Sequence, residues 1–201
     1  MKKLFLGTFI ATCFILLSGC SAVSMVKAKS QTISPPAFGK AKVVFMRYSH
    51  VAGAIGVELF DVTGGRIKFF GSLPLSSKVA YETTPGKKVF MTNGAAADFM
   101  IANLKAGKTY YVIVRPNWGT GGFAPTPIRT DGSTEYHTRI PEFKEWVEGT
   151  ELVIPGESLR KWFNADKQKE IRDRYNDYWA RFQNKTPAEV ALRTMNPSDG
   201  M

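Results

Sequence analysis

The sequence predicts a mainly β protein, a β-sandwich of seven to eight strands followed by an α-helical C-terminal region. Residues 40–116 divide into short runs rich in Val, Ile, Phe, Tyr and Thr. Glycines and prolines separate these runs at a spacing of about ten residues, which is typical of sandwiches. From residue 141 onward the apolar residues recur with a helical period among charged residues, which predicts helices.

Residues 1–19 are predicted to be a lipoprotein signal peptide. Lys2 and Lys3 precede an apolar run of 14 residues, which is too short to cross a bilayer but suits a signal sequence. The run ends in a segment that resembles a bacterial lipobox, formed by Leu17, Ser18, Gly19 and Cys20. An ordinary cleaved signal peptide and a buried core helix are the alternatives, but the run lacks the polar face of a core helix.

Lipidation of Cys20 would make the membrane a partner of the mature chain. The resemblance to a lipobox implies three acyl chains on this cysteine. Three chains would anchor the protein firmly, because a single chain already binds membranes marginally. Ser21 follows the cysteine, where an aspartate would resemble an inner-membrane retention signal. We therefore expect the outer membrane, with the domain facing the periplasm, rather than the inner membrane. Cys13 leaves with the signal peptide, so the mature chain has no internal disulfide.

Residues 20–36 form a predicted polar tether that ends in two prolines. Sixteen extended residues reach about 55 Å. The β-sandwich domain is then expected over residues 37–140, with strands at residues 41–48, 56–62, 66–73, 78–84, 88–93, 98–104 and 109–116.

Turn residues support this division into strands. Gly64 and Gly65 suit a two-residue hairpin turn, and Pro85 and Gly86 suit the centre of a type II turn. The first and the last of these strands are apolar on both faces, so we expect both in the interior of a sheet.

Residues 115–128 read as a long Gly/Pro loop, and residues 130–140 as an eighth strand. The loop carries Arg115, Trp118 and Phe123, and a cation with aromatics on a constrained loop favours a ligand or partner surface. The alternative is that Trp118 and Phe123 cover the end of the sandwich core.

Residues 141–201 form the predicted helical region. Its apolar residues fall on two faces that one straight helix cannot bury together, so we expect a break near Asn164, which can cap the following helix. Thr186 and Glu189 form a capping box around Pro187. The aromatic face of the longer helix is expected to pack on the sheet rather than to be an exposed docking surface, and it comprises Tyr175, Tyr178, Trp179 and Phe182.

Positive charge is concentrated in the β region. Residues 21–141 carry 15 Lys and Arg against 6 Asp and Glu, whereas residues 142–201 carry 10 against 11. A basic domain held near a membrane is attracted to anionic lipids or an anionic polymer, over about a Debye length of 8 Å. The alternative is charge spread evenly for solubility. Nucleic acid is not an expected partner of a tethered periplasmic domain.

The sequence predicts no catalytic residues, metal site or cofactor. Neither His50 nor His137 has a second ligand at a suitable spacing, and a metal site needs three or four ligands. No G-x-S-x-G motif is present. Four strand carboxylates could form an acid–base pair in a cleft but are expected to face solvent, namely Glu58, Asp61, Glu82 and Asp98.

Three motifs, at residues 39–47, 83–90 and 104–116, resemble a family of bacterial lipoproteins that carry a small β domain of unknown function. The turn and strand at residues 85–90 are also similar to carboxypeptidase-regulatory and transthyretin-like sandwiches. The resemblance implies an exported β-sandwich on a lipid anchor and brings no catalytic residues.

The expected function is therefore that of a non-enzymatic, lipid-anchored envelope protein. Its β-sandwich would bind a partner protein or an anionic envelope polymer. The alternative is a periplasmic envelope hydrolase with a site assembled from loops.

Overall fold

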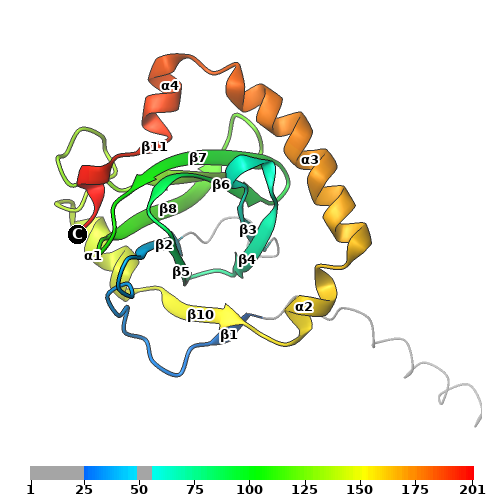
Figure 1. The fold of residues 1–201 in the computed structure, drawn as a ribbon. Coiled ribbons are helices and arrows are strands. Elements are labelled where there is room, and N and C mark those ends of the chain that lie inside the picture. The colour runs from blue at the N-terminus through cyan, green and yellow to red at the C-terminus, as the bar shows by residue number, and fades with distance from the viewer. Residues whose placement is uncertain (1–24, 49–55) are drawn as a thin grey trace, which may run out of the picture.

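The computed structural model describes residues 25–48 and 56–201. The predicted signal peptide, the lipobox with Cys20, and His50 lie outside these residues. The prediction of a mainly β, sandwich-like fold is confirmed, because two mixed sheets pack face to face (Figure 1). The two sheets contain eleven strands within the described ranges, more than the seven to eight predicted.

The first sheet has six strands in the order β1-β10-β5-β2-β8-β9. In chain order they are β1 (Met25–Lys27), β2 (Ala41–Arg47), β5 (Ser77–Thr83), β8 (Thr109–Asn117), β9 (Gly122–Pro127) and β10 (Glu151–Pro155). The parallel neighbours β2 and β8 lie inside this sheet, as their two apolar faces predicted.

The second sheet has five strands in the order β11-β7-β6-β3-β4. In chain order they are β3 (Val57–Asp61), β4 (Lys68–Leu73), β6 (Gly86–Asn93), β7 (Ala97–Leu104) and β11 (Thr194–Met195). The first four pair antiparallel, with β3 between β4 and β6, and β11 adds parallel to β7.

The main core lies between the two sheets. Val43 and Phe45 of β2 point into it together with Val112 of β8 and Phe90 of β6. The Phe45 and Phe90 rings pack edge to face with their centroids 5.3 Å apart. Alternation along the strands places one side chain in two in this core, and the other side chains on an outer face.

Helix α1 (Pro141–Glu148) covers the outer face of the first sheet. Val44 and Met46 of β2, on the side opposite the main core, pack in the same cluster as Phe143 of this helix. The Phe143 ring also meets Tyr111 of β8 edge to face, with centroids 5.4 Å apart. This cover explains why β2 and β8 are apolar on both faces.

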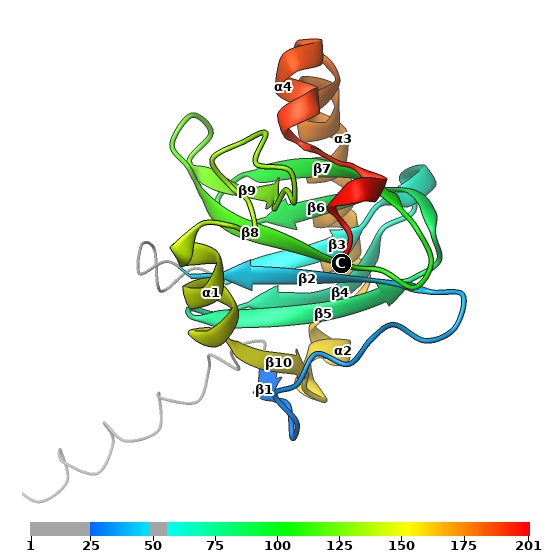
Figure 2. The ribbon, with the colours of Figure 1, turned by 90° about the vertical axis from the view of Figure 1, so that its left-hand side faces the viewer.

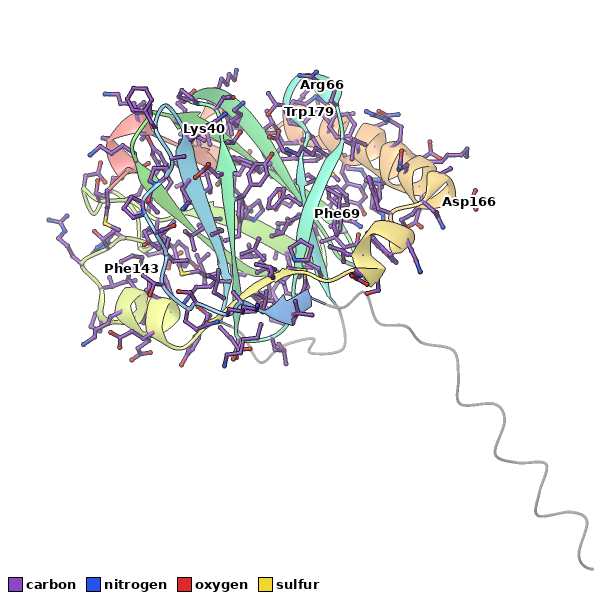
Figure 3. The ribbon with its side chains drawn as sticks, turned by 60° about the horizontal axis from the view of Figure 1, so that its bottom comes forward. Lys40, Arg66, Phe69, Phe143, Asp166 and Trp179 are labelled. Atoms are coloured by element: carbon purple, nitrogen blue, oxygen red, sulfur yellow. The ribbon has the colours of Figure 1, made fainter. Side chains whose placement is uncertain are left out.

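Helix α3 (Ala165–Gln183) covers the outer face of the second sheet. Phe99 of β7 is the centre of this contact, with its centroid 5.9 Å from Tyr175, 5.0 Å from Trp179 and 5.6 Å from Phe182. Tyr178 packs in the same cluster. The aromatic face therefore packs on the sheet, as expected, and α1 and α3 lie on opposite sides of the sandwich (Figure 3).

The predicted break and caps in the helical region are confirmed. Helix α2 (Ser158–Trp162) ends before Asn164, whose side chain accepts a hydrogen bond from the Lys167 backbone N–H at the start of α3. Helix α4 (Pro187–Leu192) begins with both hydrogen bonds of the capping box between Thr186 and Glu189. No helix in the described part of the chain is long and apolar enough to cross a membrane.

The interpretation of residues 115–128 as a loop is wrong, because β8 and β9 form an antiparallel hairpin there. Pro125 and Pro127 fit β9 because it is an edge strand, where a missing N–H costs no ladder bond. Residues 130–140 do not form the eighth strand. Gly132 has a φ of +76°, the segment turns back on itself, and only a single bridge joins Arg129 to His137.

The two glycine turns differ in outcome. Gly64 and Gly65 both have positive φ but lie in a 3-10 turn (Thr63–Gly65) within a longer connection between β3 and β4, rather than in a two-residue hairpin turn. Gly86, with a φ of +104°, adopts the left-handed conformation that the type II turn predicts.

The remaining strands come from segments assigned to the tether and to the helical region. Strand β1 pairs with β10, and β11 pairs with β7. Residues beyond β1 are also held on the sheet, since the buried Lys42 Nζ donates to the carbonyl oxygens of Ser34 and Pro35. Residues 25–35, which were assigned to the tether, therefore begin the folded structure.

We expect truncation of the α3 aromatics to destabilise the protein in proportion to their burial. Phe182→Ala should lower the free energy of unfolding by about 3–5 kcal/mol, because Phe182 is only 4% exposed. Trp179→Ala should cost less, about 2–3 kcal/mol, because Trp179 is partly exposed. Urea denaturation of the two variants measures both values, and unchanged midpoints would contradict the packing of α3 on the sheet.

Candidate anion-binding cavity

A cavity of about 470 Å³ lies beside the β8–β9 hairpin. One wall is the end of β8 with β9, the second is the loop at residues 133–136, and the third is α4 with its flanking residues. Its lining comprises Arg115, Asn117, Thr126, Ser133, Thr134, Glu135, Tyr136, Lys185, Glu189, Leu192 and Arg193.

Arg115 is the central cation of this cavity. Its Nε donates to Thr126 Oγ1 at 3.1 Å, and its guanidinium lies over the Tyr136 ring, 4.9 Å from the centroid. These contacts hold the half-buried side chain in one orientation. Arg115 forms no ion pair with any carboxylate in the described ranges, so its charge is available to a ligand.

Arg193 lies beside Arg115 but already has a carboxylate partner. Its Nη2 donates to Asp98 Oδ2 at 3.0 Å, and its Nη1 contacts Thr126 Oγ1 and the Pro125 carbonyl oxygen at 3.3 Å. Burial lowers the pKa of Arg193, while Asp98 opposes this shift and the neighbouring charge of Arg115 adds to it. The pair of guanidinium groups makes the cavity positive on this side.

Asp98 fixes the positions of the cavity walls relative to one another. It lies opposite Thr92 of β6, is 4% exposed, and accepts from Asn117 Nδ2 of β8 at 2.9 Å as well as from Arg193. Its other oxygen accepts from the Phe99 backbone N–H at 2.8 Å. One buried carboxylate thereby joins β7, the hairpin and the segment after α4.

The rest of the lining adds polar groups and one apolar side chain. Lys185 adds a third cation, and Glu135 and Glu189 add two carboxylates. Glu189 is occupied in the capping box, and its hydrogen bonds from Thr186 hold its pKa below the ordinary value. Burial raises the pKa of Tyr136, which stays a neutral ring under Arg115. Paired guanidinium groups with nearby hydroxyls suit a carboxylate or a phosphate.

The structure separates the three residues predicted on the 115–128 segment. Arg115 lines the cavity. Phe123 is 3% exposed and packs in the main core, where the Arg47 guanidinium lies 4.6 Å from its ring centroid. Trp118 is 81% exposed at the hairpin tip, outside the cavity lining. Phe123 therefore packs in the sandwich core, as the alternative interpretation predicted, whereas Trp118 does not.

Of the eleven lining residues, the sequence pointed only to Arg115 as a site residue, and it did not point to Tyr136, Lys185 or Arg193. Arg193 lies 78 positions after Arg115 in the chain, and only the packing of α4 against the hairpin brings the two together. The single local signal was the capping box of α4, which places Lys185 just before the helix and Arg193 just after it.

The four strand carboxylates do not form a common site, because each has its own partners. Asp61 accepts a hydrogen bond from Tyr81 Oη, and Asp98 accepts one from Arg193. Both carboxylates are buried, although the sequence predicted that they face solvent. Glu82 accepts from the Ala37 backbone N–H. Glu58 accepts from Asn93 Nδ2, and burial raises its pKa. Burial of Asp61 and Asp98 is possible because each carboxylate is hydrogen-bonded, whereas Glu82 is exposed, as expected.

A larger open cavity of about 980 Å³ lies between β1, β5 and the end of α1. Of its two lysines, Lys27 and Lys78, the buried Lys78 donates to the carbonyl oxygens of Val147 at 2.6 Å and Thr150 at 2.7 Å. Lys78 therefore caps the C-terminal end of α1, and burial lowers its pKa. His137 accepts from the Arg139 backbone N–H, and no group of three metal-binding side chains occurs in the described residues.

Comparison with known proteins gives no indication of the function of this chain. No family model matches the chain, and no curated protein matches its sequence.

We expect Asp98→Ala to destabilise the protein by about 3–5 kcal/mol, because it leaves the largely buried Arg193 without its carboxylate. Asp177→Ala is the matched control, since its ion pair with Arg181 is exposed and should contribute at most about 1 kcal/mol. Thermal denaturation of both variants gives the comparison. Equal losses would show that Asp98 does not hold the cavity walls together.

Proposed function

We propose that this protein is a non-enzymatic lipoprotein of the outer membrane that faces the periplasm and binds an anionic envelope polymer in the Arg115 cavity. The observation that carries the proposal is Arg115 itself, a cation held in place by Thr126 and Tyr136 without a carboxylate partner among the described residues. The excess of cations over residues 21–141 favours a polyanion as well.

Binding is better supported than hydrolysis. No histidine lines the cavity within the described ranges, so the hydroxyls of Ser133 and Thr134 have no imidazole base. Glu189 is committed to its capping box and is kept ionised, which suits a structural acceptor rather than a general acid.

The position of the cavity fits a protein anchored at its N-terminus. Strand β1, which carries the first described residues, and strand β9 form opposite edges of the six-stranded sheet (Figure 2). Five strand spacings separate them, which corresponds to about 24 Å. An anchor close to β1 therefore leaves the cavity beside β9 directed toward a polymer away from the membrane.

A partner protein is the second candidate occupant, and Trp118 favours it. This side chain is 81% exposed at the tip of the hairpin that forms one wall of the cavity. Exposed tryptophans and arginines are the residues that most often dominate protein–protein binding energies.

We expect Arg115→Gln to weaken binding to purified peptidoglycan sacculi, whose peptide stems carry free carboxylates, by about 10- to 100-fold. Lys144→Gln is the matched control, because it removes the same charge from an exposed position on α1, outside the cavity. Cosedimentation at two salt concentrations measures both effects. Equal binding by the two variants would remove the cavity from the proposal, and failure of the unmodified protein to bind would favour the partner protein.

We expect Cys20→Ala to abolish lipidation and to leave the protein unprocessed or soluble. Separation of membranes followed by a carbonate wash tests this, because three acyl chains resist extraction whereas peripheral contacts do not. A Cys20→Ala protein that stays with the outer membrane after the wash would contradict the lipid anchor.

A further inference from the structure

Strands β1 and β10 form a short antiparallel ribbon at one edge of the first sheet. Its inner side joins the main core through Val153 and Met25. On its outer side Val26 and Ile154 are direct cross-strand neighbours, and they are 45% and 47% exposed. The ribbon thus presents a pair of aliphatic side chains to the surroundings.

The ribbon is fixed immediately after the predicted lipidation site. The Ala28 backbone N–H donates to the Leu152 carbonyl oxygen at 2.8 Å. The Gln31 side chain donates to the same carbonyl oxygen and accepts from the Leu152 backbone N–H. Only residues 21–24 separate Cys20 from Met25, and the five residue-to-residue steps between them reach about 17 Å when extended. This is far less than the 55 Å expected for a tether that extended to residue 36.

A linker of this length brings the ribbon to the bilayer surface. The headgroup layer on each side of a membrane is about 5–8 Å thick, so crossing it uses a large part of the 17 Å. The first folded residues must then lie within about 10 Å of the headgroups. The ribbon follows this linker directly in the sequence, because β1 begins at Met25.

The side chains around the ribbon suit a lipid interface. Lys27 and Lys29 are exposed on or just after β1, and Lys29 forms no ion pair within the described ranges, whereas Lys27 pairs with Glu151. Long lysine side chains can rest their stems on apolar groups and extend their charges to phosphates. Beyond Pro155 lies a groove of about 620 Å³ whose lining includes Phe69, Phe70 and Phe163.

We propose that the β1–β10 ribbon is a membrane-contact surface that seats Val26 and Ile154 at the level of the lipid headgroups. This inference rests on the lipid anchor of the proposed function and adds to it a fixed orientation of the domain. The sheet then stands with β1 at the membrane and β9, with the Arg115 cavity, at its far edge.

The orientation is tested with the lipidated full-length protein in vesicles of phosphatidylethanolamine and phosphatidylglycerol. Cys13 leaves with the signal peptide and Cys20 is acylated, so Ile154→Cys supplies a single thiol for an environment-sensitive fluorophore. Trp118→Cys is the matched control, because Trp118 is more exposed and lies at the opposite edge of the sheet. We expect a blue-shifted emission and reduced quenching by aqueous iodide at position 154 and neither change at position 118.

Each other outcome overturns the proposal in a recognisable way. If the protein floats with the vesicles but the two labels remain equally accessible to iodide, the ribbon does not contact the bilayer although the anchor is intact. If both labels are protected, the domain has no fixed orientation. If the protein does not float with the vesicles, the lipid anchor itself is wrong. Addition of Val26→Asp to the Ile154→Cys protein should restore quenching while leaving flotation unchanged.

Discussion

The fold depends on the burial of both faces of the central strands β2 and β8. Their side chains alternate between the main core and the outer cluster beneath α1, so a bare two-sheet sandwich would leave Val44 and Met46 of β2 in water. Helix α1 removes that surface from solvent, and α3 does the same for Phe60 and Phe99 on the second sheet. At about 25 cal/mol per Å² of apolar surface, these outer layers are part of the stability of the fold rather than an appendage.

The packing of α3 on the second sheet also determines where the cavity forms. Because α3 lies along the second sheet, the chain after it passes the end of the β8–β9 hairpin, and α4 places Arg193 against Asp98. A buried ion pair of this kind contributes little net stability, since desolvation offsets the attraction, but it fixes geometry. A second buried pair, Arg129 with Asp199 at 2.7 Å, holds the chain after β11. Arg115 and Lys185 are thereby left as the cavity cations that form no ion pair within the described residues.

The two edges of the first sheet then have different roles in the proposed function. The β1 edge continues directly from the short linker after Cys20, and the β9 edge carries the cavity. Neighbouring strands of a sheet lie about 4.8 Å apart, so the number of strands sets the distance between the two edges. In the proposed function, the domain would join a lipid surface at one edge to an anionic partner at the other.

The sequence by itself determined the features that depend on residues close together in the chain. The short β runs, the break at Asn164 and the capping box at Thr186 were predictable because turns and caps involve contacts within about four residues. The tertiary structure alone decided that Pro125 and Pro127 lie in an edge strand, that β1, β10 and β11 join the sheets, and that Arg193 lies beside Arg115. These features depend on strand pairing and helix docking between distant segments, whose partners no local pattern specifies.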